Sequence, residues 1–205
     1  MKLKIRYFVY LILASLFLFP INGYSEFKVP QIRGPVNDYA QILPQTTVVS
    51  LNNLLRELKN IKKSEVAVLT VNNLSNETIE QASIKVTDQW TLGTKNDDNG
   101  ILLMITMKEK RMRIEVGQGF EGNLTDSDAA EIIFRTMRPL MRAGDPASAV
   151  IAGLYKVVEQ AYPELDTEEF FKKHLRFVNQ RNRQKMNKTQ IIIFIIINVS
   201  CLSLM

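Results

Sequence analysis

The chain has 205 residues, enough for one domain with short appendages, and a formal net charge of +5. The basic excess lies at the two ends, because residues 26–165 carry slightly more Asp and Glu than Lys and Arg. This distribution argues against a nucleic-acid-binding domain, which needs a basic stripe on the fold itself, and favours ends that touch a membrane.

Residues 1–25 have the pattern of a secretory signal peptide. Three basic residues precede an apolar run at residues 7–19, and a small-x-small sequence ends at Ser25. We expect cleavage after Ser25, with an uncleaved anchor as the alternative, because the apolar run is short for a membrane span. In either case the middle of the chain is expected outside the cytoplasm, in the periplasm or on the outer face of the cell envelope.

Hydrophobic periodicity predicts the secondary structure of residues 26–165. An irregular lead-in is expected at residues 26–36, where Pro and Gly are frequent. Helical stripes of apolar residues are found at 44–62, 77–91, 127–137 and 146–162. Continuous apolar runs predict buried strands at 66–71 and 100–107, and alternation predicts a half-covered strand at 111–116. This order predicts an α/β fold, a three-layer α/β/α sandwich around a small mixed β-sheet.

The C-terminal part of the chain is expected to lie outside this domain. Residues 166–189 predict a basic charged linker, which either lies on anionic lipid head groups or forms a solvated helix. Residues 190–205 are apolar but short for a span, so we expect a marginal membrane anchor: a tail anchor, an interfacial segment or a truncated span. The one cysteine, Cys201, lies here, so no disulfide forms within one chain.

Two loops rich in Gly and carboxylates flank the predicted β-hairpin. A hairpin with strands of equal length brings both loops to one end of the sheet. The side chains expected to converge there are Asp97, Asp98, Asn99, Glu121 and Asp126. Carboxylate and amide oxygens are the ligands of hard divalent cations, so this set predicts a site for Ca²⁺, with Mg²⁺ as the alternative.

The same residues have structural interpretations. The sequence Asp97-Asp98-Asn99-Gly100 is typical of a turn, and Asp126 is suited to cap the next helix. On these interpretations the carboxylates are turn formers and caps, and no ion binds.

The context of three glycines and the position of the only histidine argue against nucleotide binding and histidine-based catalysis. Gly117, Gly119 and Gly122 form a G-x-G-x-x-G pattern, but no parallel strand follows, so nucleotide binding is not expected. The glycines are expected to adopt positive φ angles in a tight loop. His174 lies in the basic segment, so histidine-based catalysis is not available within the domain.

Four motifs in order resemble those of TPM domains. They are G-P-V-N-D-Y-A-Q-I-L-P at 34–44, W-T-L-G-T-K-N-D-D-N-G-I-L-L at 90–103, R-I-E-V-G-Q-G-F-E-G-N-L-T-D at 113–126 and R-P-L-M-R-A-G-D at 138–145. The resemblance implies an α/β/α sandwich that is exported and membrane-tethered. Some relatives are linked to divalent-cation binding, and one is associated with acid phosphatase activity. Asp38, in the first motif, becomes a further candidate ligand.

The expected function is therefore accessory. We expect an exported, membrane-associated domain that binds a divalent cation and serves membrane-protein partners in the envelope. The alternative is a metal-assisted acid phosphatase, in which the ion polarises a phosphoryl oxygen and Arg111 or Arg113 orients the anion. Neither a nucleic acid nor a nucleotide is expected as a partner.

Overall fold

Four strands form one mixed β-sheet in the computed structural model, which describes residues 26–94, 96–120 and 122–175. The strands are β1 (Val36–Asp38), β2 (Glu65–Val71), β3 (Gly100–Thr106) and β4 (Arg111–Val116). They lie in the order β1-β2-β3-β4, with β1, β2 and β3 parallel and β4 antiparallel to β3. The expected signal peptide and the apolar segment at 190–205 lie outside the described residues.

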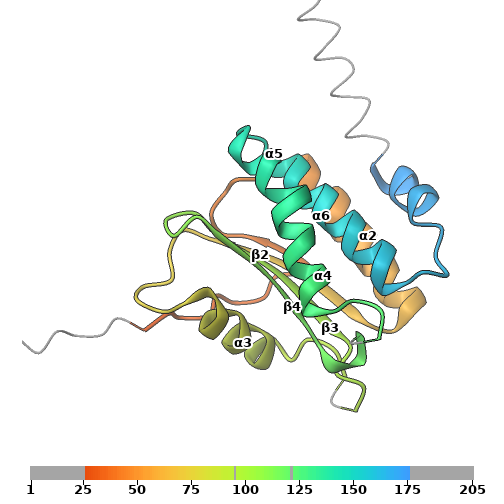
Figure 1. The fold of residues 1–205 in the computed structure, drawn as a ribbon, viewed down its shortest axis with the longest axis horizontal. Coiled ribbons are helices and arrows are strands. Elements are labelled where there is room, and N and C mark those ends of the chain that lie inside the picture. The colour runs from red at the N-terminus through yellow and green to blue at the C-terminus, as the bar shows by residue number, and fades with distance from the viewer. Residues whose placement is uncertain (1–25, 95, 121, 176–205) are drawn as a thin grey trace, which may run out of the picture.

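Helices cover both faces of the sheet, as Figure 1 shows. The helix α3 (Ile79–Trp90) packs on one face, and α2 (Gln45–Lys62) and α6 (Pro146–Ala161) pack on the other. Because β2 and β3 are flanked by strands and covered by helices, nearly all their residues are buried, which explains their continuous apolar sequences. The three-layer α/β/α sandwich predicted from the sequence is confirmed.

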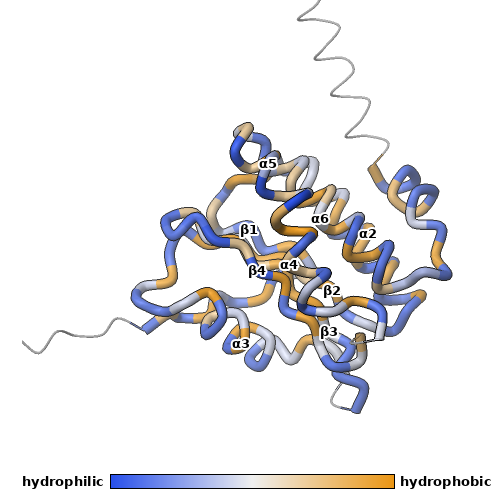
Figure 2. Tube along the Cα trace, viewed as in Figure 1, coloured by the Kyte–Doolittle hydropathy of each residue, from blue (hydrophilic) through white to orange (hydrophobic). Residues whose placement is uncertain are grey.

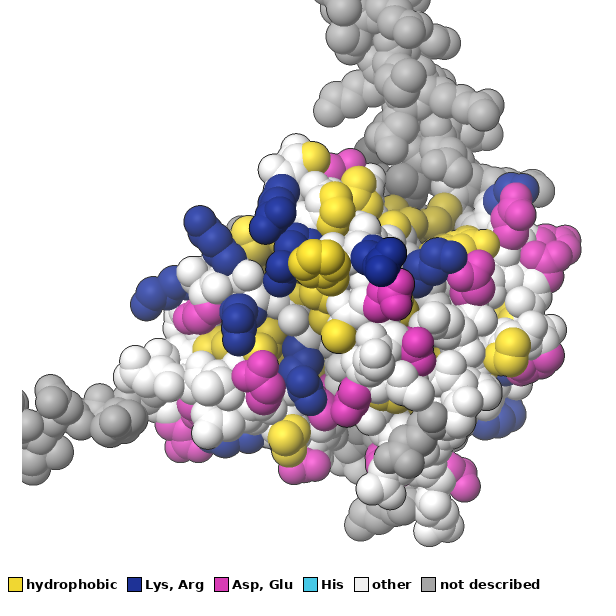
Figure 3. All heavy atoms as spheres, viewed as in Figure 1, with side chains coloured by type: hydrophobic (Ala, Val, Ile, Leu, Met, Phe, Trp, Pro, Cys, Tyr) yellow, Lys and Arg dark blue, Asp and Glu magenta, His cyan; other side chains and the backbone are white. Residues whose placement is uncertain are grey.

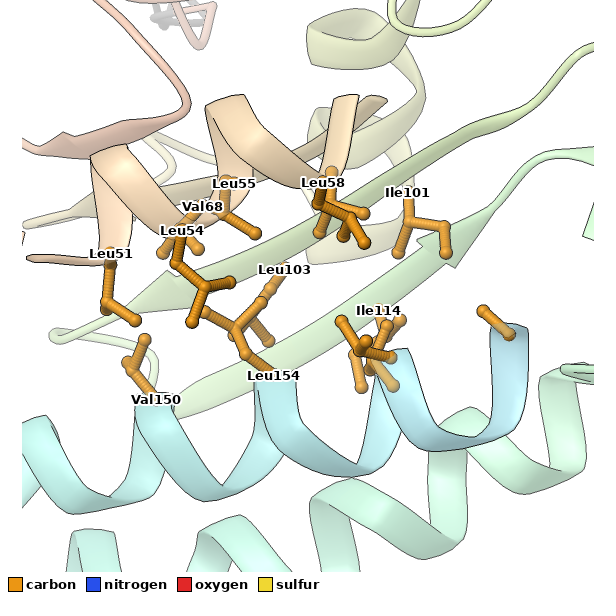
Figure 4. Packing of buried hydrophobic residues seen from close by; sticks show 14 of the residues in the cluster. Leu51, Leu54, Leu55, Leu58, Val68, Ile101, Leu103, Ile114, Val150 and Leu154 are labelled. Carbon is orange, nitrogen blue, oxygen red and sulfur yellow. The ribbon is translucent and has the colours of Figure 1, made fainter. Parts of the chain in front are cut away.

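The side chains of β3 point alternately into two hydrophobic cores. Ile101 and Leu103 enter the core beneath α2 and α6, while Leu102 and Met104 enter the core beneath α3. In Figure 4 the helical stripe of α2 faces Val68, Leu103 and the side chains of α6; this stripe is formed by Leu51, Leu54, Leu55 and Leu58. Hydrophobic segments accordingly lie inside the trace and hydrophilic ones in the connecting loops (Figure 2).

The short strand β1 begins at Val36, the last residue of the segment that was expected to be irregular. It has only three residues and pairs with β2 from Val36 opposite Val68 to Asp38 opposite Thr70. Asn37 is buried, accepts a hydrogen bond from the Arg33 N–H and donates one to the Gly34 carbonyl. Three residues carry no periodic pattern, so only pairing with β2 identifies this strand.

One continuous helical segment replaces the helix expected at 127–137. It consists of α4 (Asp126–Glu131), a π-helical turn η2 (Ile132–Met137) and α5 (Arg138–Arg142). The Arg138 N–H donates to the Ile133 carbonyl, five residues back. Pro139 follows, and a proline within a regular α-helix collides with the carbonyl four residues before it. The wider turn carries the helix past this proline to Arg142.

A further helix at residues 167–175 extends the packed fold beyond the boundary expected at residue 165. Phe170, Phe171 and Leu175 are buried in the core beneath α2 and α6. Glu57 of α2 accepts hydrogen bonds from Lys173 (2.7 Å) and His174 (2.8 Å), and these bonds lower the pKa of its carboxyl. The expected linker therefore begins as an amphipathic helix. Its few apolar residues are separated by charged ones, so the sequence pattern did not identify it as part of the folded domain. No helix in the described ranges is long and apolar enough to cross a membrane.

Removing the Phe171 side chain tests whether this helix belongs to the cooperative fold. We expect Phe171→Ala to lower the free energy of unfolding by about 3 kcal/mol, because it opens a cavity in the core. Lys172→Ala, on the exposed face of the same helix, should change it by about 0.5 kcal/mol or less. Urea denaturation measures both. Equally small effects would mean that the helix is not part of the folded unit.

Candidate functional site

The two loops predicted to converge lie at the same end of the sheet, where β3 begins and β4 ends. We call residues 92–94, 96–99 and 117–120 the paired loops. The Gly117 N–H donates to the Gly100 carbonyl at 2.8 Å, and the Gly119 N–H donates to the Asp98 carbonyl at 3.1 Å. The Asp98 Oδ2 accepts a hydrogen bond from the Gln118 N–H at 2.9 Å. Main-chain bonds and one bond to the Asp98 side chain therefore hold the two loops together as one unit.

The glycines of the second loop permit close approach of two backbones. A Cβ on Gly117 would lie 2.0 Å from the Asp98 carbonyl oxygen, and one on Gly119 would lie 2.2 Å from the Asp97 carbonyl oxygen. The second-loop glycines were expected to adopt positive φ angles, and this expectation is wrong. Among the described glycines, Gly93 and Gly144 are the ones with a positive φ. In the first loop Asp98 itself has a φ of 43°, a conformation that Asp tolerates better than most residues.

The first loop is closed by its own side chains. The Asn99 Oδ1 accepts from the Thr94 N–H at 2.9 Å, and its Nδ2 donates to the Lys63 carbonyl at 3.0 Å. The Asp97 Oδ2 accepts from the Thr94 hydroxyl at 2.7 Å. Both functions of the Asn99 amide are thus occupied, whereas Asp97 and Asp98 are exposed and keep further oxygen lone pairs. The Asn99 amide is therefore used within the protein, and the two carboxylates remain accessible to solvent.

Glu65 is a residue of this site that the sequence reasoning missed. Its Oε2 accepts a hydrogen bond from the Gly93 N–H at 3.1 Å, and its own N–H donates to the Asn99 carbonyl at 3.1 Å. Its carboxylate also pairs with Lys59 of α2. Glu65 therefore ties the first loop to the start of β2. A carboxylate immediately before a buried strand was the only sequence signal.

Asp38 is not brought to the paired loops. It ends β1, and β1 runs parallel to β3, so Asp38 lies at the opposite end of the sheet. Its carboxylate accepts hydrogen bonds from the Ile42 and Leu43 N–H groups at 3.1 and 2.9 Å and from the Thr70 hydroxyl. Asp38 therefore holds the turn that leads to α2.

Asp126 lies on the first turn of α4 and is not the cap of that helix. The cap is Thr125, whose side chain and that of Asp128 form a capping box, and these hydrogen bonds lower the pKa of Asp128. Asp126 and Arg113 line the same groove. The hydrogen bond from Arg113 to Glu115 raises the pKa of the Arg113 guanidinium, and the negative charge of Asp126 raises it further. The last candidate, Glu121, lies outside the described residues.

The donor chemistry of the paired loops suits a hard cation, but the number of donors is small. Asp97 and Asp98 are adjacent carboxylates, which Ca²⁺ and Mg²⁺ prefer as ligands. Within the described ranges, no group of three or more His, Cys, Asp or Glu side chains is arranged to hold a metal ion. An ion here would take its remaining ligands from backbone carbonyls and water.

The family of the chain follows from comparison with known proteins. A family model described as TPM domain matches residues 36–160, which is more than half of the chain. The chain belongs to the TPM domain family. The matched range includes the whole sheet, both loops of the site and most of α6.

The chain is also similar to solved structures. The solution structure of the N-terminal domain of a protein from P. gingivalis is 31% identical, covers 62% of this chain and 80% of its own, and superposes with a TM-score of 0.57. The N-terminal domain of a Corynebacterium glutamicum protein is 13% identical and covers 67% of this chain and 87% of its own, with a TM-score of 0.47. No curated protein matches the chain.

Adding one methyl group at Gly117 tests the close approach of the paired loops. We expect Gly117→Ala to destabilise the TPM domain by at least about 2 kcal/mol, because the new Cβ collides with the backbone of Asp98. The matched control is Gly122→Ala, since a Cβ there meets nothing within 4 Å. The control should shift stability by no more than about 0.5 kcal/mol. Similar urea midpoints for the two variants would contradict the contact.

Proposed function

We propose that this TPM domain binds a divalent cation at the paired loops, with Ca²⁺ as the first choice and Mg²⁺ as the alternative. The observation that carries the proposal is the fixed position of two adjacent, exposed carboxylates, Asp97 and Asp98. Their loop is held by Glu65, by the Lys63 carbonyl and by the Gln118 N–H. Ligands that are ordered before binding lose little conformational entropy when the ion arrives.

The ligand set supports weak binding. Ca²⁺ takes about six to eight oxygen ligands, whereas the described part of the paired loops offers two exposed carboxylates, each of which already accepts a hydrogen bond. Calcium affinity falls as the number of charged ligands falls, and extracellular modules have dissociation constants of about 10⁻⁴ to 10⁻³ M. We therefore place the expected affinity of this site in that range.

We further propose that the domain is exported and acts beside a membrane, where it binds or maintains membrane-protein partners of the cell envelope. The signal-peptide pattern of residues 1–25 and the apolar residues 190–205 support this location. Two side chains of types often used in catalysis, a histidine and a serine, are engaged by other residues, which is also consistent with a binding role. His174 packs against Glu57, and the buried Ser64 hydroxyl shares a hydrogen bond with Tyr162.

Metal-assisted phosphate-ester hydrolysis, the alternative from the sequence, has less support. Arg111 lies opposite Thr106, at the far end of β3 from the paired loops, and β3 spans about 20 Å. Arg113 is paired with Glu115. Arg111 is thus distant from the paired loops, Arg113 is engaged by Glu115, and a phosphatase assay with bound ion would test the alternative directly.

Calorimetric titration of the full-length chain tests the cation site. We expect saturable binding of Ca²⁺ with a dissociation constant of about 10⁻⁴ to 10⁻³ M. Asp97→Asn and Asp98→Asn should each weaken binding at least tenfold, because each removes one of the two anionic ligands. The amide that replaces the Asp98 carboxylate still has an oxygen to accept the hydrogen bond from the Gln118 N–H, so the loop should keep its shape.

The matched control for this titration is Asp88→Asn, which removes an exposed carboxylate from α3. It should leave the affinity unchanged. Absence of saturable heat at 10 mM Ca²⁺ and 10 mM Mg²⁺, roughly ten times the weakest expected constant, would overturn the proposal. An equal loss in the control variant would assign the binding to general surface charge.

A further inference from the structure

A hollow of about 600 Å³ opens at the other end of the sheet, beside the turn between β3 and β4. Its walls combine two kinds of side chain. Ile105, Met107, Met112 and Met141 supply the apolar part, and Lys110, Arg111, Arg138 and Arg142 supply the charge. We call these residues, with Thr106, the basic hollow. Methionine is flexible and polarizable, so a surface rich in it adapts to apolar ligands of varied shape.

The four cations of the basic hollow are exposed, and none of them forms an ion pair in the part of the chain that the structure describes. Two carboxylates lie close by without forming an ion pair with these cations. Glu109 accepts hydrogen bonds from the Thr106 hydroxyl and the Leu74 N–H, and Glu80 lies near both Arg111 and Arg113. Positive charge therefore accumulates here on a domain that is slightly acidic as a whole. In Figure 3, Lys and Arg side chains gather around hydrophobic ones on the side of the molecule that carries α5.

An aromatic side chain stands next to the basic hollow. Phe134 is 62% exposed, the most exposed large hydrophobic residue of the described ranges, and the Arg138 guanidinium lies 5.2 Å from its ring centroid. Phe134 belongs to the π-helical turn η2, whereas Met137 of the same turn is fully buried. Phe134, Arg138 and Met112 line the groove that adjoins the hollow. Exposed Phe, Trp or Leu side chains together with Lys and Arg are typical of helices that lie in a membrane interface.

We propose that the basic hollow binds the phosphate of an anionic phospholipid head group at a bilayer surface, with Phe134 and Met107 entering the interface. Charge complementarity supports this occupant, because four unpaired cations face a phosphodiester that carries one negative charge. The methionine-lined wall provides apolar contact for the glycerol and the upper acyl chain. The inference is independent of the cation site, since the two lie at opposite ends of β3.

Methyl NMR of the methionines tests the proposal in the full-length chain, held in uncharged detergent micelles. The chain has eight methionines. Phosphatidylglycerol added to the micelles should shift the methyl signals of Met107, Met112 and Met141 in a saturable manner. The signals of Met104 and Met137, which are fully buried, should stay in place and report an intact fold. Phosphatidylcholine should cause no such shift.

Variants separate the basic hollow from general charge. The double variant Arg138→Glu/Arg142→Glu should weaken the phosphatidylglycerol response at least about tenfold, since each basic residue near an anionic surface contributes roughly a fivefold gain. Arg138→Gln/Arg142→Gln should weaken it less, which provides a second reading if charge reversal disturbs folding. The matched control is Arg56→Glu, on the exposed face of α2, and it should leave the response unchanged.

Three outcomes would overturn the proposal. The first is absence of saturable shifts at the three methionines. The second is soluble glycerol 3-phosphate binding as tightly as the lipid, which would assign the hollow to a free phosphate anion. The third is an acidic peptide, such as oligoglutamate, binding at the same methionines more tightly than phosphatidylglycerol, which would assign the surface to a protein partner.

Discussion

The burial of β3 on both faces is the constraint on which the rest of the structure depends. All seven of its residues are buried, and it pairs in parallel with β2 and antiparallel with β4. Each pairing positions a different loop. The connection from β2 through α3 places Asp97 and Asp98 at the beginning of β3, and the tight turn after Thr106 places Lys110 and Arg111 at the end of β3. The strand thereby separates an acidic surface from a basic one.

This separation shapes the chemistry that the domain can perform. A metal-assisted hydrolase concentrates carboxylates, an ion and a cation around one phosphoryl group. Here the exposed carboxylates of Asp97 and Asp98 and the unpaired cations near Arg111 are held about 20 Å apart by the length of β3. Two separate surfaces agree better with the proposed accessory role, in which an ion would bind at one end and a membrane or partner at the other.

The candidate site shows how far local sequence patterns reach. Convergence of the two loops followed from equal strand lengths in the hairpin, and the structure has both loops at one end of the sheet. The contacts of individual residues did not follow from the strand lengths. Asp38 binds the turn after β1, Asn99 uses both ends of its amide inside its loop, and Glu65 joins the site from another strand. Each depends on a partner distant in sequence, which no local pattern reveals.

The sequence by itself determined the class of the fold, because apolar periodicity records which face of a helix or strand is buried. It also determined the hairpin of β3 and β4, although it could not say that Gly117 makes room for the Asp98 backbone. Only the tertiary structure decided the three-residue strand β1, the π-helical turn before Pro139 and the packing of residues 167–175. The strand β1 and the helix at 167–175 depend on pairing and packing with segments far away in the sequence, whereas the π-helical turn accommodates Pro139 within one continuous helix.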